Sequence, residues 1–170
     1  ENTAWRINAR SSALVPPLAT FAPNMFRSSP GTRIEISVQD HSLAMGETDL
    51  VLSFEEPSKG NIIRKKVGSM EFNAVCSRYF QNDLEGWISI DYGSVTPSLE
   101  VPMHDYFSTG PMLKSFGMPA IKQVVLDSPL AAILPAHMTQ SDPYITQLGG
   151  ERAQVSLDIW LFYHASRRGD

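Results

Sequence analysis

Hydrophobic and polar residues alternate with a period of two in several short segments of the chain. Ile34, Ile36 and Val38 are separated by polar residues, which is the pattern of a strand buried on one face. Residues 49–53 hold a short apolar run, as expected of a strand covered on both faces. The connection between them, residues 41–48, contains no Asn-Gly or Asp-Gly hairpin signal.

The same patterns predict further strands and two helical stretches. The other predicted strands are residues 5–9, 62–67, 70–76, 87–91, 122–126 and 155–164. Leu14, Leu18 and Phe21 keep helical spacing behind Pro16-Pro17, and a weaker helical spacing runs from Tyr106 to Phe116 across Gly110-Pro111. Strands that alternate with helical stretches indicate an α/β protein with mainly parallel pairing.

Two connections are short for parallel strands. A parallel crossover needs about a dozen residues or more, whereas residues 41–48 and 127–130 offer fewer. Either these neighbours are antiparallel, or the natural chain carries additional loop and helix residues at these places.

Composition narrows the class of protein. A chain of 170 residues with 42% hydrophobic and 19% charged residues is an ordinary globular protein of one medium domain or two small lobes. Its net charge of −4 argues against a surface that binds nucleic-acid phosphates directly. No segment has the length of a membrane span and no signal-peptide pattern opens the sequence, so we expect a cytoplasmic protein.

Residue types that carry catalysis are present but scattered. The single cysteine, Cys76, lies on the apolar face of a predicted strand and is expected to be a buried, inert thiol. The four histidines lack the short spacings of a zinc site, and the sequence holds neither a G-x-S-x-G elbow nor a phosphate loop. We therefore predict no catalytic residue, no metal and no cofactor.

Six segments, taken in chain order, resemble the effector-binding domain of LysR-type transcriptional regulators. The first four are RINA, LVPPLATFAP, GTRIEISVQD and GETDLVLSF. They are similar to the family's first strand, its helix opening with LPPLL, the PG turn and second strand, and the G--D segment before the third strand. Further on, KQVVLDS with AAILPAHM resembles the family's strand and G-G-a-LP segment, and SLDIWLFYHASRR resembles its returning strand.

The resemblance implies an α/β, two-subdomain, periplasmic-binding-protein-like (type 2) fold with a ligand cleft between the lobes. One regulatory subdomain would hold residues 1–75 plus 158–170, and the other residues 76–157. Against the family pattern, the sequence is short after Ala9, after Ser42 and after Ser128. We also expect the family's N-terminal winged helix-turn-helix DNA-binding domain and its last helix to be absent from this chain.

Polar residues that follow predicted strands are the candidates for effector binding, because ligands of open α/β sheets bind at the carboxyl ends of strands. Ser11 and Ser12 stand between a strand and a helix, where an anion can bind, although either can simply cap the helix. Arg10 can pair with a carboxylate or lie in solvent. The other candidates at predicted strand ends are His41, Ser42, Ser53, Phe54, Tyr92, Ser94, Asp127 and Ser128.

We therefore predict a small-molecule effector-sensing domain of a LysR-type DNA-binding transcription regulator, which is not an enzyme. The effector would shift the population of lobe or dimer arrangements. Its expected partners are the effector, a second copy in a homodimer or tetramer, and DNA only through the missing N-terminal domain, with no membrane contact. The alternative is a periplasmic solute-binding protein of a transporter, which shares the two-lobed architecture. A periplasmic-binding-like enzyme is a third hypothesis and requires a reactive cluster that the sequence does not show.

Overall fold

The computed structural model describes residues 4–38, 48–58, 60–118 and 120–167 of the chain. The chain divides into two compact units. Unit 1 consists of Glu1–Gly68 with Asp158–Asp170, and unit 2 of Ser69–Leu157. The subdomain boundary expected near residue 75 stays a prediction.

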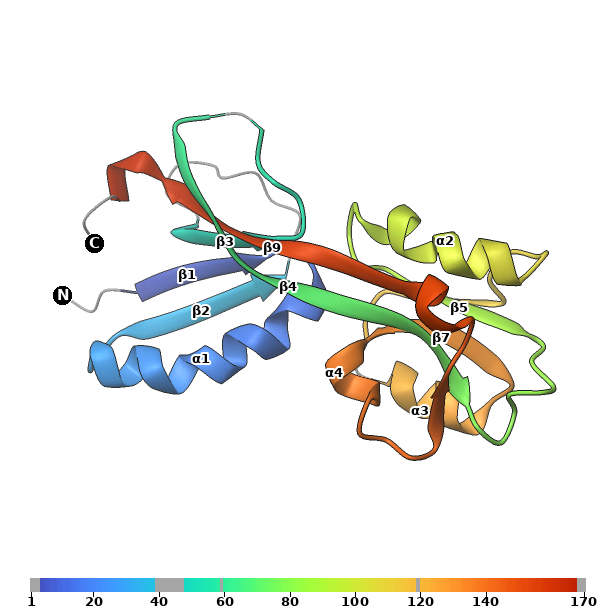
Figure 1. Cartoon of the computed structure of the whole chain (residues 1–170). Helices are drawn as coiled ribbons and strands as arrows, with labels where there is room; N and C mark the ends of the chain where they lie inside the picture. Colours follow the sequence, from blue (N-terminus) through green and yellow to red (C-terminus); the bar gives the residue numbers. More distant parts are fainter. Residues whose placement is uncertain (1–3, 39–47, 59, 119, 168–170) are drawn as a thin grey trace. The chain divides into compact units, whose positions relative to one another are not determined.

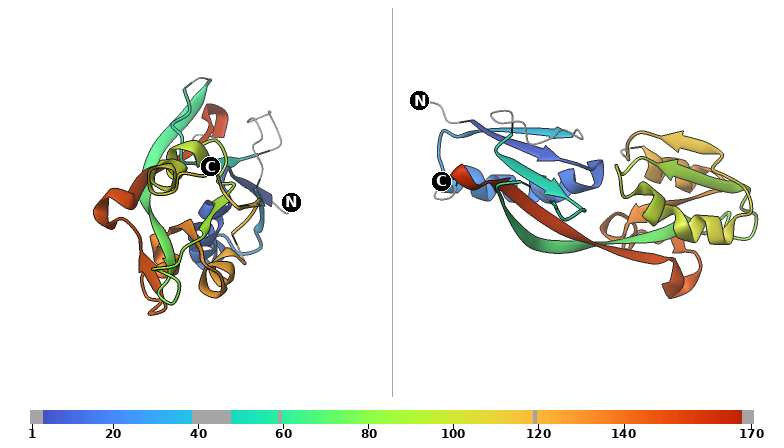
Figure 2. Two further views of the ribbon diagram at one scale, coloured as in Figure 1. Left: turned by 90° about the vertical axis from the view of Figure 1, so that its right-hand side faces the viewer. Right: turned by 90° about the horizontal axis from the view of Figure 1, so that it is seen from above.

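Unit 1 is built on three parallel strands. β1 (Ala4–Ala9) pairs with β2 (Arg33–Val38) on one side and with β3 (Leu50–Ser53) on the other, in parallel with both. β9 (Gln154–His164) then pairs antiparallel with β3 (Figures 1 and 2). β2 and β3 therefore run in the same direction, so the alternative that they are antiparallel is wrong. The link between them, residues 39–47, lies outside the described residues.

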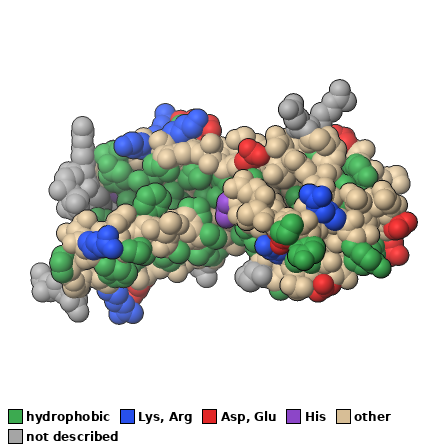
Figure 3. All heavy atoms as spheres, turned by 60° about the horizontal axis from the view of Figure 1, so that its bottom comes forward, with side chains coloured by type: hydrophobic (Ala, Val, Ile, Leu, Met, Phe, Trp, Pro, Cys, Tyr) green, Lys and Arg blue, Asp and Glu red, His purple; other side chains and the backbone are tan. Residues whose placement is uncertain are grey.

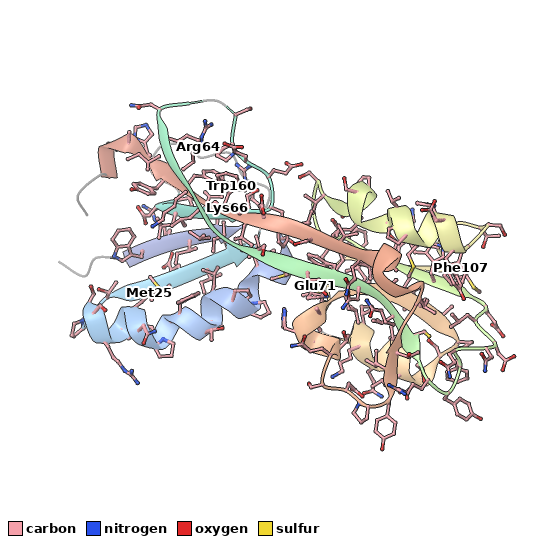
Figure 4. The ribbon with its side chains drawn as sticks, viewed as in Figure 1. Met25, Arg64, Lys66, Glu71, Phe107 and Trp160 are labelled. Carbon is pink, nitrogen blue, oxygen red and sulfur yellow. The ribbon has the colours of Figure 1, made fainter. Side chains whose placement is uncertain are left out.

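The predicted helix after Ser11-Ser12 is confirmed. A short 3-10 helix, η1 (Ser12–Leu14), leads into α1 (Val15–Ser28), which has proline in its first turn as the sequence predicts. α1 carries the chain from β1 to β2 along one face of the sheet of unit 1, where Leu18 and Met25 of α1 and Leu14 of η1 line a pocket together with residues of the strands (Figures 1, 2 and 4).

The long strand β4 (Ile62–Ser77) replaces the two strands predicted at 62–67 and 70–76. Gly68 and Ser69 belong to β4, so the polar interruption in the sequence does not end the strand. Lys66 of β4 forms an ion pair with Asp158 of β9 in unit 1, with 2.8 Å between Nζ and Oδ1 (Figure 4). In unit 2, Gln154 of β9 donates a hydrogen bond of 3.0 Å to the Glu71 carboxylate of β4 (Figure 4).

Unit 2 has a mixed sheet. β4 pairs antiparallel with β7 (Leu130–Pro135) and with β8 (Ile145–Gln147), while β5 (Gly86–Ile90) pairs in parallel with β7 and with β6 (Leu113–Ser115). α2 (Thr96–Tyr106) connects β5 to β6, and α3 (Ile121–Asp127) connects β6 to β7. These two helices lie on opposite faces of the sheet (Figures 1 and 2). α4 (Ala136–Thr139) follows β7, and η2 (Gly150–Ala153) and η3 (Ala165–Arg167) are short 3-10 helices.

The strand prediction for residues 122–126 is wrong, because this segment lies in α3. Ile121 and Val125, four residues apart, are the buried residues of the helix, so helical packing on the sheet outweighs the strand preference of its two valines. The correction also accounts for the short connection at 127–130. The crossover helix precedes Ser128, and only a short link is needed to enter β7.

The weak helical spacing predicted between Tyr106 and Phe116 is also wrong. α2 ends at Tyr106, Leu113 lies in β6, and Phe116 is exposed. α2 is instead anchored by its two buried residues, Leu99 and Met103, which lie one turn apart on the same face of the helix.

Each unit has its own apolar core. In unit 2 the core centres on Trp87 and Phe72, both fully buried, and Trp87 donates from its indole N–H to the carbonyl oxygen of Thr109 at 3.1 Å. Cys76 is buried as predicted, and burial raises the pKa of its thiol. In unit 1 the buried apolar residues include Leu14 and Phe162.

Candidate functional site

The carboxyl ends of β1 and β3 come together at one edge of unit 1, because the two strands are parallel neighbours. The backbone N–H of Arg10 donates a 3.0 Å hydrogen bond to the carbonyl oxygen of Leu52, which fixes the end of β1 beside the end of β3. The structure therefore brings together five of the predicted site residues, namely Arg10, Ser11, Ser12, Ser53 and Phe54.

The two serines at this edge have different environments. Ser11 is buried, and its Oγ accepts a 3.3 Å hydrogen bond from the N–H of Ala13, so Ser11 caps η1. The Ser12 Oγ is also buried, but it has no hydrogen-bond partner among the described residues. Because buried polar atoms are normally paired, the Ser12 hydroxyl is a candidate group for binding a ligand.

Arg10 contributes a cation to the same edge. Its guanidinium carbon lies 5.0 Å from the centre of the buried Phe162 ring, which is cation–π geometry. Its Nε is buried and has no hydrogen-bond partner in the described part of the chain. The guanidinium thus packs on the aromatic ring, and its Nε is a candidate donor for an anion.

Sequence reasoning missed Asn8 and Phe162. Asn8 lies in β1, is 1% exposed, and donates from Nδ2 to the Ser37 Oγ at 3.3 Å, whereas its Oδ1 lacks a partner among the residues described. A polar residue inside the predicted strand 5–9 was the available signal, because asparagine is depleted in strands. Nothing in the sequence places Phe162 beside Arg10, since the contact depends on the pairing of β3 with β9.

Two other candidates of unit 1, Ser53 and Phe54, make contacts that stabilise the fold. The Ser53 Oγ accepts a 3.0 Å hydrogen bond from the N–H of Glu55, which closes the turn after β3. Phe54 is 8% exposed and belongs to the core. His41 and Ser42 lie outside the described residues.

In unit 2, the loop after β5 carries Tyr92 and Ser94. The Tyr92 hydroxyl donates a 2.6 Å hydrogen bond to the carbonyl oxygen of Ile133, and its ring packs edge-to-face on Phe72 with 5.3 Å between centroids. Burial raises the pKa of Tyr92 far above its ordinary value. Ser94 is exposed in the turn before α2. This loop lies at the carboxyl end of β5, as predicted.

Asp127 and Ser128 lie at the opposite end of the unit 2 sheet. They end α3 and precede β7, whose first residue, Leu130, pairs with Gly86 at the start of β5. Asp127 accepts a hydrogen bond from Gln123, and the Ser128 hydroxyl donates to the carbonyl oxygen of Val124. The structure thus separates this pair from the carboxyl ends of β5 and β7.

An apolar pocket of about 280 Å³ lies between α1 and the sheet of unit 1. Leu18 and Phe21 of α1 face Leu52, Ile159 and other apolar residues of the strands across it. Figure 3 shows apolar side chains gathered on this face of unit 1. Among the described residues, no helix is long and apolar enough to cross a membrane, and no three metal-ligating side chains gather.

Comparison with solved structures identifies the fold. The regulatory domain of HypT from Salmonella typhimurium in its apo form superposes with a TM-score of 0.79 at 15% identity, covering 97% of this chain and 88% of that one. Its bromide ion-bound form gives 0.77 at 15% identity, with 98% and 88% covered. Full-length AphB from Vibrio cholerae, a member of the LTTR protein family, gives 0.72 at 13% identity, with 96% of this chain and 62% of that chain covered.

No protein-family model matches the sequence, and no curated protein sequence matches it. At the identities of the solved structures the likeness establishes the fold. The predicted α/β, periplasmic-binding-protein-like type 2 fold is therefore confirmed. The ligand cleft that the resemblance implies stays a prediction.

Proposed function

We propose that this chain is the small-molecule effector-sensing domain of a LysR-type DNA-binding transcription regulator. The observation that carries the proposal is the fold shared with the HypT regulatory domain over 97% of the chain. The sequence resemblance, which was established on different grounds, points to the same family. No observation favours the alternative of a periplasmic solute-binding protein.

The effector we propose is a small anion or carboxylate held at the carboxyl end of β1. Three features support this chemistry: the free Nε of Arg10, the unpartnered hydroxyl of Ser12, and the amino end of the η1–α1 helical segment that follows them. An arginine donor and a hydroxyl beside a helix amino end are the groups that bind carboxylates and other anions. That the HypT domain has a bromide ion-bound structure agrees with an anion as ligand of this fold.

In this proposal the domain acts in the cytoplasm, as a homodimer or tetramer, and contacts DNA only through an N-terminal domain. Effector binding favours one arrangement of the assembly and so changes the spacing of the DNA-binding domains. The proposed function includes no catalytic step.

Thermal-shift and calorimetric titration of the chain with acetate, benzoate, chloride, bromide, phosphate and sulfate tests the site. We expect at least one of these anions to bind, and Ser12→Ala and Arg10→Met each to weaken binding about tenfold, the usual effect of losing one charge-assisted hydrogen bond. The matched controls are Ser98→Ala and Arg27→Met, whose side chains are exposed. Equal anion affinities for all four variants would contradict the placement of the effector site at this edge of unit 1.

The regulatory part of the proposal is tested with the full-length protein. DNA footprinting with and without the bound anion should show a changed length or spacing of the protected region. A footprint that the anion leaves unchanged contradicts effector sensing, whatever the affinity for the isolated chain.

A further inference from the structure

Unit 2 contains a polar pocket that neither the resemblance nor the proposed effector site accounts for. Its volume is about 490 Å³, within the range of pockets that bind small molecules. It lies on the face of β4 that carries Asn73 and Val75, and α4, residues 140–143 and β8 form its other walls. The neighbouring residue Ala74 points to the other face, where it meets α2 residues in a separate pocket. Every residue of the polar pocket belongs to unit 2.

Asn73 is the buried anchor of this pocket. It is 8% exposed, and its side-chain oxygen Oδ1 is fully buried without a hydrogen-bond partner among the described residues. Its neighbours along β4 and its register partner Leu134 on β7 are apolar and offer no side-chain donor. A half turn about the last side-chain bond exchanges Oδ1 with Nδ2, so the oxygen can face the pocket that Asn73 lines. An acceptor that faces this pocket can receive a hydrogen bond from a donor of a ligand.

Arg78 supplies a cation at the other end of the pocket. Its backbone is fixed by a 2.9 Å hydrogen bond from its N–H to the carbonyl oxygen of Tyr144. Its guanidinium forms no ion pair with any residue that the structure describes, and the side chain is exposed. A free guanidinium on the rim of a pocket is a binding group for a carboxylate.

The carboxylate of Asp142, in contrast, is already engaged. It accepts a 2.9 Å hydrogen bond from the N–H of Tyr144 and forms an ion pair of 3.1 Å with Lys122. The backbone hydrogen bond and, after it, Lys122 hold the pKa of Asp142 below its ordinary value, so it stays negatively charged at neutral pH. The residues that line the pocket thus include the Asn73 acceptor, the free cation of Arg78, the engaged carboxylate of Asp142, and the apolar side chains of Val75 and Ile145.

We propose that this pocket binds a small zwitterion of the amino-acid type, with its ammonium group at the Asn73 oxygen and its carboxylate at Arg78. Asn73 lies in β4 and Arg78 is the first residue of the turn after it, so their Cα atoms are separated by at most roughly 16 Å, the length of five extended residues. After the two side chains have reached inward, the remaining gap suits a dipeptide, which spans roughly 7 Å, better than a single amino acid. The site is additional to the effector site proposed in unit 1.

The test is titration of the chain with L-Ala-L-Ala and with L-alanine, followed by calorimetry and by 15N–1H NMR. We expect the dipeptide to bind more tightly than alanine and to shift the amide signals of residues 73–78 and 145–147. N-acetyl-Ala-Ala and Ala-Ala-amide each lack one of the two charges and should bind at least tenfold more weakly. Failure of both alanine and the dipeptide to bind at millimolar concentration overturns the proposal.

Variants locate the binding and separate it from the effector site. Arg78→Met and Asn73→Leu should each lower the affinity for the dipeptide at least tenfold, while Ser12→Ala and the exposed control Arg27→Met leave it unchanged. Because Asn73→Leu removes an unpartnered buried acceptor, its melting temperature without ligand should equal or exceed that of the parent chain. Dipeptide binding that survives Arg78→Met, an exposed substitution that leaves the core intact, overturns the assignment even if Asn73→Leu does not fold.

Discussion

At the scale of single residues, buried polar side chains fall into two groups. Tyr92 and Ser11 have hydrogen bonds that complete the local fold. Asn8, Ser12 and Asn73 each keep one buried atom without a partner among the described residues. A buried polar atom without a partner costs stability, about 1–3 kcal/mol in typical cases. The hydrogen bonds of the first group stabilise the fold, and the two proposed binding sites use Ser12 and Asn73 of the second group.

Tyr92→Phe should lower the free energy of unfolding by about 1–2 kcal/mol, because it removes the hydroxyl that donates to Ile133 and leaves that buried carbonyl oxygen without this donor. Urea unfolding followed by circular dichroism measures the difference. The control is Tyr79→Phe, at a residue that is 84% exposed, and it should change stability little. Equal effects of the two variants would contradict a structural role for the Tyr92 hydroxyl.

The same residue predicts a pH dependence at alkaline pH. Burial raises the pKa of Tyr92 in the folded chain above its ordinary value of 10.0. Above pH 10 the unfolded chain loses this proton and the folded chain keeps it, so the contribution of Tyr92 to stability is complete below that pH and declines above it. The parent chain should therefore lose stability faster than Tyr92→Phe above pH 10, and parallel curves would contradict this.

At the scale of elements, local chemistry and tertiary packing each decide different boundaries. The ends of α1 follow from the local sequence, since Ser11 caps the preceding turn, prolines occupy the first turn, and a Pro-Gly turn follows. The local sequence does not determine that α3 is a helix, because its short apolar segment suits a strand as well as a helix. The helix is favoured because it buries both Ile121 and Val125 on the same face, against the sheet.

Gly31→Ala tests the turn that ends α1. Gly31 has a φ of 85°, and the N–H of Thr32 donates to the carbonyl oxygen of Ser29 at 3.2 Å, as in a turn with Pro30 and Gly31 at its centre. No atom lies within 4 Å of an added Cβ, so the expected loss of about 1 kcal/mol comes from backbone strain alone. Gly110→Ala is the matched control, with equal space around its Cβ and no positive φ. Thermal or urea unfolding that ranks the two variants equally would contradict the explanation.

At the scale of the whole molecule, the two units differ in how deeply their elements are buried. α1 has no fully buried residue and most of β2 is exposed, whereas β7 is buried along almost its whole length. Native-state hydrogen exchange depends on such differences, because sparsely packed elements open more easily than core strands.

Hydrogen exchange followed by mass spectrometry should therefore show early exchange in α1 and β2 of unit 1, and late exchange in β5 and β7 of unit 2. Binding of the proposed anion should slow exchange in residues 10–15, at the start of η1 and α1. Binding of the dipeptide should slow exchange in residues 145–147. Uniform protection of both units without ligand would contradict the difference in packing.

Much of the candidate site was accessible from the sequence. The order of strands and helix in residues 5–54 placed Arg10 and both serines at the end of β1, because the carboxyl ends of parallel strands meet at one edge. The prediction that Asp127 and Ser128 bind the effector depends on a strand at residues 122–126. Such a strand would put them at a carboxyl end, whereas α3 puts them at the start of β7.

The sequence by itself determined the α/β class, the positions of most strands, the first helix with its cap and turn, and the fold that the ordered motifs indicated. These features depend on local periodicity and turn chemistry, which act over a few residues. Only the tertiary structure decided that α3 is a helix, that Phe162 lies beside Arg10, and that Asn73 lines a pocket with Arg78. These features depend on contacts between segments distant along the chain, and such contacts leave no periodic signal in the sequence.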